Sequence, residues 1–236
     1  MGIKPVVPVF FGGATALQRR VSRVIVGCIL VALAASTSLA AGGQDVADAT
    51  YPKAGTYKLY RIQSASSGIV LEDSVWKPRL LSNYTRGQIT LFSFFYATCR
   101  DPLGCPAIWS AYDEVRSTIA KEPSLHGKVR LVLLSLDPKT DTPELLSFYK
   151  TKSSKEVPWY FLTTWSEYFL KPILQNMGVQ AARVVDDNGK KTDLINHMVK
   201  VFLIDNDGWV REIYTTSFLS PEAVMNDIRT LAMESQ

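Results

Sequence analysis

The sequence has few of the residues and motifs that mark several large classes of protein. Three cysteines and two histidines occur in 236 residues, and so few cysteines exclude a disulfide scaffold. A P-loop, a G-x-G-x-x-G turn and a G-x-S-x-G nucleophile elbow are absent from the sequence. Hydrophobic residues at 47% and charged residues at 20% argue against disorder and against a polytopic membrane protein. The composition therefore indicates one or two globular domains that contain few chemically reactive residues. One domain is favoured.

A surplus of positive charge is also missing outside the N-terminal segment. Before Asp45 the charged residues are Lys4, Arg19, Arg20 and Arg23, all of them basic. Without these four, the 26 basic residues fall to 22, which equals the 22 acidic residues. A nucleic-acid-binding domain would carry a basic surplus, so we expect no nucleic-acid partner.

Residues 1–40 have the pattern of a signal peptide. Arginines precede an apolar run of 12 residues at 24–35, and a small-x-small cleavage site follows at residues 38–40. A membrane span needs about 20 residues, but the uncharged stretch continues to about Gly43, so an uncleaved anchor is the alternative. In both cases we expect a periplasmic or otherwise exported protein that contacts the membrane only through such an anchor. Cys28 is interpreted as a small apolar residue of this segment.

The rest of the chain has the pattern of an α/β protein. Residues 41–54 are expected to form a linker, and 55–236 one domain. Two nearly continuous apolar runs, 89–96 and 129–135, are typical of strands covered on both faces. The other expected elements are an N-terminal hairpin from about 57–62 and 68–71, helices from 106, over 144–150 and over 166–177, a strand at 161–163, a hairpin of 198–204 with 209–214, and a helix from 221. This order predicts a thioredoxin-like fold, with helices on both sides of a central mixed sheet.

Cys99 and Cys105 lie between the strand at 89–96 and the helix opened by Pro106. A pair six positions apart in an exported domain is a local disulfide, a redox couple or a metal clamp. Cys105 is expected at the start of the helix, where unpaired backbone N–H groups favour a thiolate. We therefore expect its pKa to be lowered.

The two histidines have different surroundings. His126 follows a polar connection and is expected to be solvated, whereas His197 precedes an apolar strand, where a lone histidine is by default a packed residue. Two thiolates with one imidazole would form a soft three-coordinate site that selects Cu(I) and can also hold Cu(II). Zinc usually takes a fourth ligand. Asp137 and Asp141 are expected to shape the turn after the strand at 129–135.

The sequence resembles the Sco/SenC family of copper chaperones, which have a thioredoxin-like fold. Three blocks carry the resemblance: the aromatic strand that leads into Cys99 with Cys105-Pro106, the segment from Ser135-Leu136-Asp137-Pro138 to Asp141-Thr142-Pro143, and His197 before an apolar strand and Asp205-Asn206-Asp207-Gly208. The resemblance implies that Cys99, Cys105 and His197 bind copper, as Cu(I) or Cu(II). It also implies delivery to the copper centre of cytochrome c oxidase or to another exported copper enzyme.

Two features depart from the pattern of this family. Five residues separate Cys99 from Cys105, where the family usually has three, and Asn196 stands where many relatives carry an acid. The alternative function is a thiol–disulfide oxidoreductase, in which Cys99 and Cys105 react with cysteines of a periplasmic partner and a thiol reductase completes the cycle. The sequence lacks the C-x-x-C motif of such enzymes, and enzymatic activity is left open.

Overall fold

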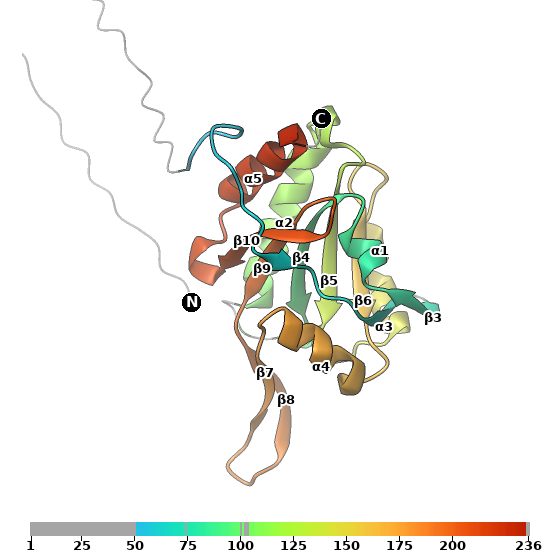
Figure 1. Cartoon of the computed structure of the whole chain (residues 1–236). Coiled ribbons are helices and arrows are strands. Elements are labelled where there is room, and N and C mark those ends of the chain that lie inside the picture. The colour runs from blue at the N-terminus through green and yellow to red at the C-terminus, as the bar shows by residue number, and fades with distance from the viewer. Residues whose placement is uncertain (1–50, 74, 100, 102–103, 235–236) are drawn as a thin grey trace, which may run out of the picture. The chain divides into compact units, whose positions relative to one another are not determined.

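An eight-stranded mixed sheet forms the centre of the described chain (Figure 1). A computed structural model describes residues 51–73, 75–99, 101 and 104–234. The expected signal peptide and most of the expected linker lie outside the described residues. Among those described, no helix is both long enough and apolar enough to cross a membrane.

The strands are β1 (Gln63–Ser64), β2 (Ile69–Glu72), β3 (Val75–Leu80), β4 (Ile89–Phe95), β5 (Val129–Ser135), β6 (Trp159–Thr163), β7 (Ala181–Val185), β8 (Lys191–His197), β9 (Lys200–Ile204) and β10 (Trp209–Thr215). The α-helices are α1 (Ser82–Thr85), α2 (Cys105–Ala120), α3 (Pro143–Leu146), α4 (Glu167–Asn176) and α5 (Pro221–Glu234). Short 3-10 helices lie at Pro123–Leu125, Ser147–Lys152 and Thr216–Phe218.

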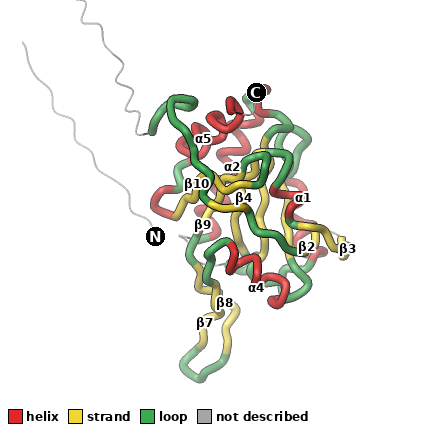
Figure 2. The backbone as a smooth tube through the Cα atoms, viewed as in Figure 1, coloured by secondary structure: helices red, strands yellow, loops and turns green. Residues whose placement is uncertain are grey.

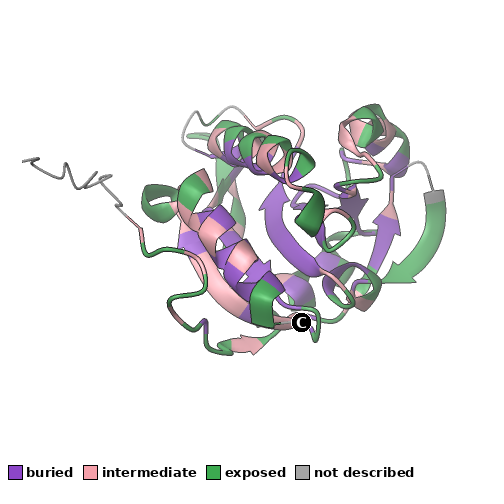
Figure 3. Ribbon diagram, turned by 90° about the horizontal axis from the view of Figure 1, so that it is seen from above, coloured by how far each residue is buried: buried purple, intermediate pink, exposed green. Residues whose placement is uncertain are grey.

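The strand order of the central sheet is β1-β10-β9-β4-β5-β6-β2-β3. β4, β5 and β6 run parallel, and the other neighbours in the sheet are antiparallel. Every residue of β4 and β5 is buried, and Figure 3 shows these strands in purple between layers of helix. Strands covered on both faces explain why these two segments are almost continuously apolar. The predicted thioredoxin-like α/β fold is confirmed.

Helix α2 positions one end of the cysteine loop. Its apolar residues Ile108, Tyr112, Val115 and Ile119 follow the helical spacing and are all buried. They pack in the main core, and α2 also contacts α5. The helix is therefore held along its length, which fixes its first residue against the end of β4.

The N-terminal hairpin differs from the expected one in its pairing. β2 is the expected second arm, but its partner β3 follows it in the chain. The segment around 57–62 is not a strand, although Leu59 is buried and the Tyr57 hydroxyl donates to Asp227. One side of this segment packs on the body, and strand pairing begins only at its end, where the Ile62 N–H donates to the Val210 carbonyl at 2.9 Å beside β1.

A second hairpin, β7–β8, was not expected from the sequence. It forms a separate two-stranded sheet, and Figure 2 shows it extending away from the central strands. Most of its residues are exposed, so the chain there carries no strong apolar period. His197 is the last residue of β8, and the apolar strand expected from 198 begins at Lys200.

Candidate metal site at the cysteine loop

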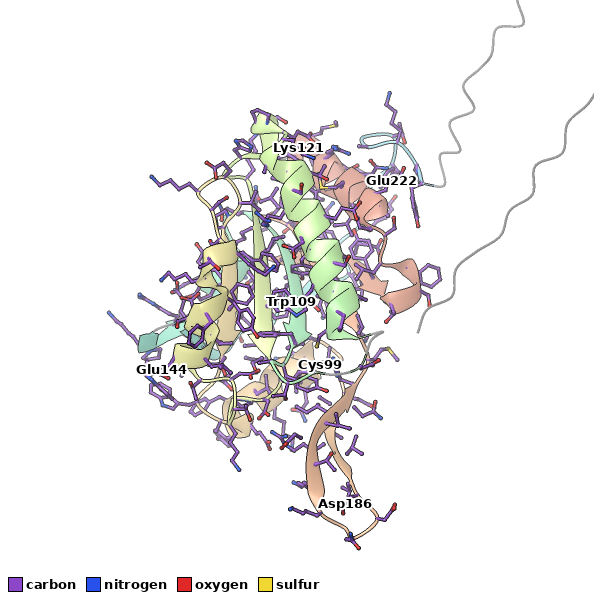
Figure 4. All side chains as sticks on the ribbon, turned by 180° about the vertical axis from the view of Figure 1, so that it is seen from behind. Cys99, Trp109, Lys121, Glu144, Asp186 and Glu222 are labelled. Carbon is purple, nitrogen blue, oxygen red and sulfur yellow. The ribbon has the colours of Figure 1, made fainter. Side chains whose placement is uncertain are left out.

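The loop between β4 and α2 carries both candidate thiols. Cys99 is partly buried, Cys105 is 2% exposed, and neither forms a disulfide. The Cys99 backbone N–H donates to the Tyr96 carbonyl at 3.1 Å, which turns the chain directly after the strand. Figure 4 shows Cys99 beside the end of α2, near the base of the β7–β8 hairpin. Arg100, Pro102 and Leu103 lie outside the described residues.

The two sulfur atoms are brought together. Cys105 is the first residue of α2, and its thiol lies close enough to the Cys99 side chain for the two to interact. Its Sγ also lies 4.0 Å from the Tyr96 carbonyl oxygen. Burial, followed by the interaction with Cys99, raises the pKa of the Cys105 thiol. The expected lowering of this pKa is wrong, because desolvation of a thiolate at this buried position outweighs the helix N-terminus.

The imidazole of His197 has one satisfied and one unsatisfied nitrogen. Its Nδ1 lies 3.0 Å from the Ile195 carbonyl oxygen. A carbonyl only accepts, so Nδ1 carries the proton and Nε2 carries the lone pair. Nε2 is buried and has no hydrogen-bond partner among the residues that the structure describes. A metal-ligating histidine typically has this arrangement, with one ring nitrogen held by a backbone carbonyl and the other available.

Tyr96 contacts all three candidate ligands or their immediate neighbours. Its ring meets the His197 ring edge-on, with the centroids 5.8 Å apart. Its hydroxyl forms a hydrogen bond with Cys99 and accepts from the Ile195 N–H at 3.4 Å. Burial raises the pKa of Tyr96 to about 12, so the hydroxyl stays protonated. Tyr96 is not among the site residues predicted from the sequence, although its place three residues before Cys99 was a usable signal.

Asp137 and Asp141 connect the turn after β5 to both sides of the site. The Asp141 carboxylate accepts from the Ala97 N–H at 3.1 Å and from the Ser135 hydroxyl at 2.6 Å. Asp137 forms an ion pair with Arg183 on β7. The turn itself closes through the Asp141 N–H and the Asp137 carbonyl, 2.8 Å apart. Its carboxylates therefore also hold the cysteine loop and the hairpin, beyond the expected role in the turn.

The structure does not bring the three candidate ligands to one point. Over the described ranges, no group of three or more His, Cys, Asp and Glu residues is arranged to hold a metal ion. A cleft of about 640 Å³ is lined by residues of the loop and of the hairpin: Tyr96, Thr98, Asp101, Leu194 and Asn196. The two thiols are paired, and His197 has to approach them for a three-ligand site to form.

His126 lies far from this loop. It follows the C-terminal end of α2, where its Nε2 lies 3.1 Å from the Ala120 carbonyl oxygen. The 16-residue helix separates it from Cys105 by about 24 Å. The other histidine of the chain therefore does not belong to the candidate site.

A family model and a curated relative match this chain in sequence. The family model described as SCO1/SenC matches residues 79–233. An SCO2-like protein of Rickettsia prowazekii is 28% identical over 129 residues, which cover 54% of this chain and 58% of that protein. The chain thus matches somewhat more than half the length of this relative.

Two solved structures show the same fold. ScoI of Bradyrhizobium japonicum with copper bound has a TM-score of 0.56 and 21% identity, covering 71% of this chain and 99% of that one. BsSco, a member of the Sco family of cytochrome c oxidase assembly proteins with a disulfide switch, has a TM-score of 0.55 and 16% identity. That match covers 75% of this chain and 98% of BsSco.

Proposed function

The chain belongs to the SCO1/SenC family, and from this premise we propose that it is an exported copper chaperone. Copper is its cargo, held by Cys99, Cys105 and His197. The recipient is the copper centre of a respiratory oxidase such as cytochrome c oxidase, or another exported copper enzyme. A copper-bound ScoI and an oxidase assembly protein among the structures with this fold support the proposal.

The observation that carries the proposal is the state of His197. A buried polar atom without a partner costs free energy, about 1–3 kcal/mol, and is retained where it has a use. His197 Nε2 is such an atom, and the hydrogen bond of Nδ1 to the Ile195 carbonyl leaves its lone pair available. Of the five buried side-chain atoms without a partner among the described residues, His197 Nε2 is the one that lies beside the cysteine loop and can ligate a metal.

The thiol pair supplies the other two ligands. Soft thiolates select Cu(I), and the imidazole nitrogen extends the set to Cu(II). Binding displaces the proton of each thiol, so copper has to compete with a proton that burial holds on Cys105. This competition favours a site that releases its cargo to a recipient.

The experiment measures copper stoichiometry and competition affinity of the reduced chain and its variants. We expect about one copper per chain in the parent, and none in Cys99→Ser or Cys105→Ser. His197→Ala should lower the affinity by at least about a hundredfold, most strongly for Cu(II). His126→Ala is the matched control and should bind like the parent. If His197→Ala binds copper as tightly as the parent, the proposed ligand set is wrong.

A second candidate function rests on the interaction between the two free thiols. In a thiol–disulfide oxidoreductase, the dithiol would reduce a disulfide of a partner. Cys99 and Cys105 would lose two electrons and two protons and form a disulfide, and the partner would gain two thiols. This exchange does not involve the imidazole. A variant His197→Ala that lost copper but kept the reduction potential of the cysteine pair would separate the two functions.

A further inference from the structure

The β7–β8 hairpin carries His197 but is not part of the central sheet. Within the described chain its strands pair only with each other. Figure 4 shows the hairpin projecting from the body, with Asp186 at its far tip. A lone two-stranded hairpin is marginally stable in water, so contacts with the body have to fix its orientation.

One face of the hairpin points to the body. The register pairs Arg183 with Ile195 and Ala181 with His197. Because side chains alternate along a strand, Arg183, Ile195 and His197 lie on the same face. Ile195 is buried and the Arg183 side chain is 16% exposed, whereas Asn196 on the other face is exposed and borders the cleft beside the cysteine loop. Arg183 and His197 therefore share the inner face.

Arg183 connects this face to the body through a buried carboxylate. Its guanidinium pairs with Asp137, whose side chain is 1% exposed. Glu167 on α4 lies 3.9 Å from the same guanidinium but is 70% exposed. Exposed pairs contribute little, whereas a buried carboxylate strongly requires its partner. Asp137 is therefore the carboxylate that determines where Arg183 lies.

The turn that holds Arg183 also holds the cysteine loop. The Asp137 N–H donates to the Ser135 hydroxyl oxygen at 2.9 Å, and that hydroxyl donates to Asp141. Asp141 accepts the N–H of Ala97, two residues before Cys99. Arg183 in turn lies opposite Ile195, two residues before His197. Residues 135–141 thus form one frame that both halves of the candidate site contact.

We propose that Arg183 is a positioning residue for His197: through Asp137 it keeps the hairpin beside the cysteine loop, from where His197 approaches the thiol pair when copper binds. This inference rests on the proposed copper function. The hairpin also contacts the loop through the edge-on Tyr96 and His197 rings and through a hydrogen bond from the Ile195 N–H to the Tyr96 hydroxyl, which is long at 3.4 Å. Without the ion pair, the hairpin would have no buried charged contact with the frame among those described, and His197 Nε2 would sample many orientations.

The first test is hydrogen exchange of the metal-free reduced chain. Arg183→Gln should speed amide exchange in residues 181–197 by about tenfold or more and leave β4 and β5 unchanged. Arg183→Lys keeps the charge and should restore most of the protection. Lys190→Gln removes an exposed charge from the same hairpin and should behave like the parent.

Arg183→Gln leaves Asp137 buried without its cation, which can destabilise the whole fold. A double variant, Asp137→Asn with Arg183→Gln, removes both charges and avoids this problem. We expect it to fold while its hairpin still exchanges faster than in the parent. Unchanged hairpin exchange in a folded double variant would overturn the proposal.

The second test is the copper signature of the same variants. Loss of a group that orients a ligand typically lowers metal affinity on the order of ten- to a hundredfold. Arg183→Gln should lose that much Cu(II) affinity and give a weaker, broader nitrogen hyperfine pattern in the electron paramagnetic resonance spectrum. A looser hairpin with unchanged affinity and spectrum would refute the positioning of His197. If the parent itself takes up no copper, the proposed function fails, and the exchange measurement still decides whether Arg183 fixes the hairpin.

Discussion

Cys105 occupies the first position of α2, where unpaired amides favour a negative charge, yet its sulfur is almost fully buried. The two effects act in opposite directions on the pKa, and burial is the larger. A sequence shows that a cysteine begins a helix, but not how deeply its side chain lies. Helix position was therefore predictable, and the direction of the pKa shift was not.

The burial difference between the two cysteines predicts unequal reactivity. In the metal-free reduced chain, Cys99 should react with iodoacetamide at least about tenfold faster than Cys105, because access and thiolate fraction control the rate. Peptide mapping by mass spectrometry separates the two sites and Cys28. Partial unfolding in urea should equalise the rates. Equal rates in the native chain would contradict the buried position of Cys105.

The Asp141 side chain, which belongs to the frame of residues 135–141, makes the stability of the fold depend on pH. Burial raises its pKa above the ordinary value of 3.8, although hydrogen bonds from Ser135 and Ala97 act the other way. The folded chain therefore binds more protons than the unfolded chain in the window above pH 3.8, and this group's contribution to the free energy of unfolding falls as the pH rises through that window.

Asp141→Asn removes this titration. Relative to the variant, the parent should lose stability with rising pH, by about 1.4 kcal/mol for every unit by which the folded pKa exceeds the unfolded one. Urea unfolding from about pH 4 to about pH 8 measures the difference. The exposed Asp187 lies outside the frame, and Asp187→Asn serves as the control. Parallel pH profiles for the parent and Asp141→Asn would show that Asp141 has an ordinary pKa.

At the scale of elements, the predictability of each segment followed its burial. β4 and β5 are covered on both faces and were recognisable as apolar runs, and the buried stripe of α2 was recognisable from its helical spacing. β7 and β8 have one thin inner face, with Ile195 as its buried residue, so no apolar period marked them. The ion pair that joins the hairpin to the body, between Arg183 and Asp137, links residues that are distant in the sequence.

Buried residues of α2 that lie far from the cysteines are expected to stabilise the fold without affecting the candidate site. Ile119 is fully buried near the end of α2 that lies away from the cysteines. Ile119→Ala should lower the free energy of unfolding by about 2–5 kcal/mol and leave copper affinity unchanged. Ser117→Ala, an exposed substitution on the same helix, should change stability by less than about 0.5 kcal/mol. Chemical denaturation and copper competition measure the two effects. A copper defect in Ile119→Ala would mean that the site depends on the whole helix.

At the scale of the whole molecule, the resemblance to the Sco/SenC family predicted more of the proposed function than the residues alone did. The thiol pair was visible as a metal clamp or redox couple, but the role of His197 depended on the family pattern. The structure adds the unpaired Nε2 and the contacts with Tyr96, neither of which a sequence motif contains. It also places the two thiols at one element and His197 on a separate hairpin, so the proposed ligand set is divided between two elements that residues 135–141 connect.

The proposed export of this chain predicts how its N-terminal segment is processed. Residues 1–40 carry an arginine-flanked apolar run and a small-x-small site at 38–40. We expect the exported protein to begin near Ala41, because the strongest apolar run is shorter than the roughly 20 residues of a membrane span. Mass spectrometry of the protein from its native compartment measures the N-terminus directly. Replacing Ala40 with a bulky residue should block cleavage and leave a longer, membrane-associated form, whereas the same change at Ala47 should leave processing unchanged. A native protein that retains Met1 would show instead that the segment stays as an anchor.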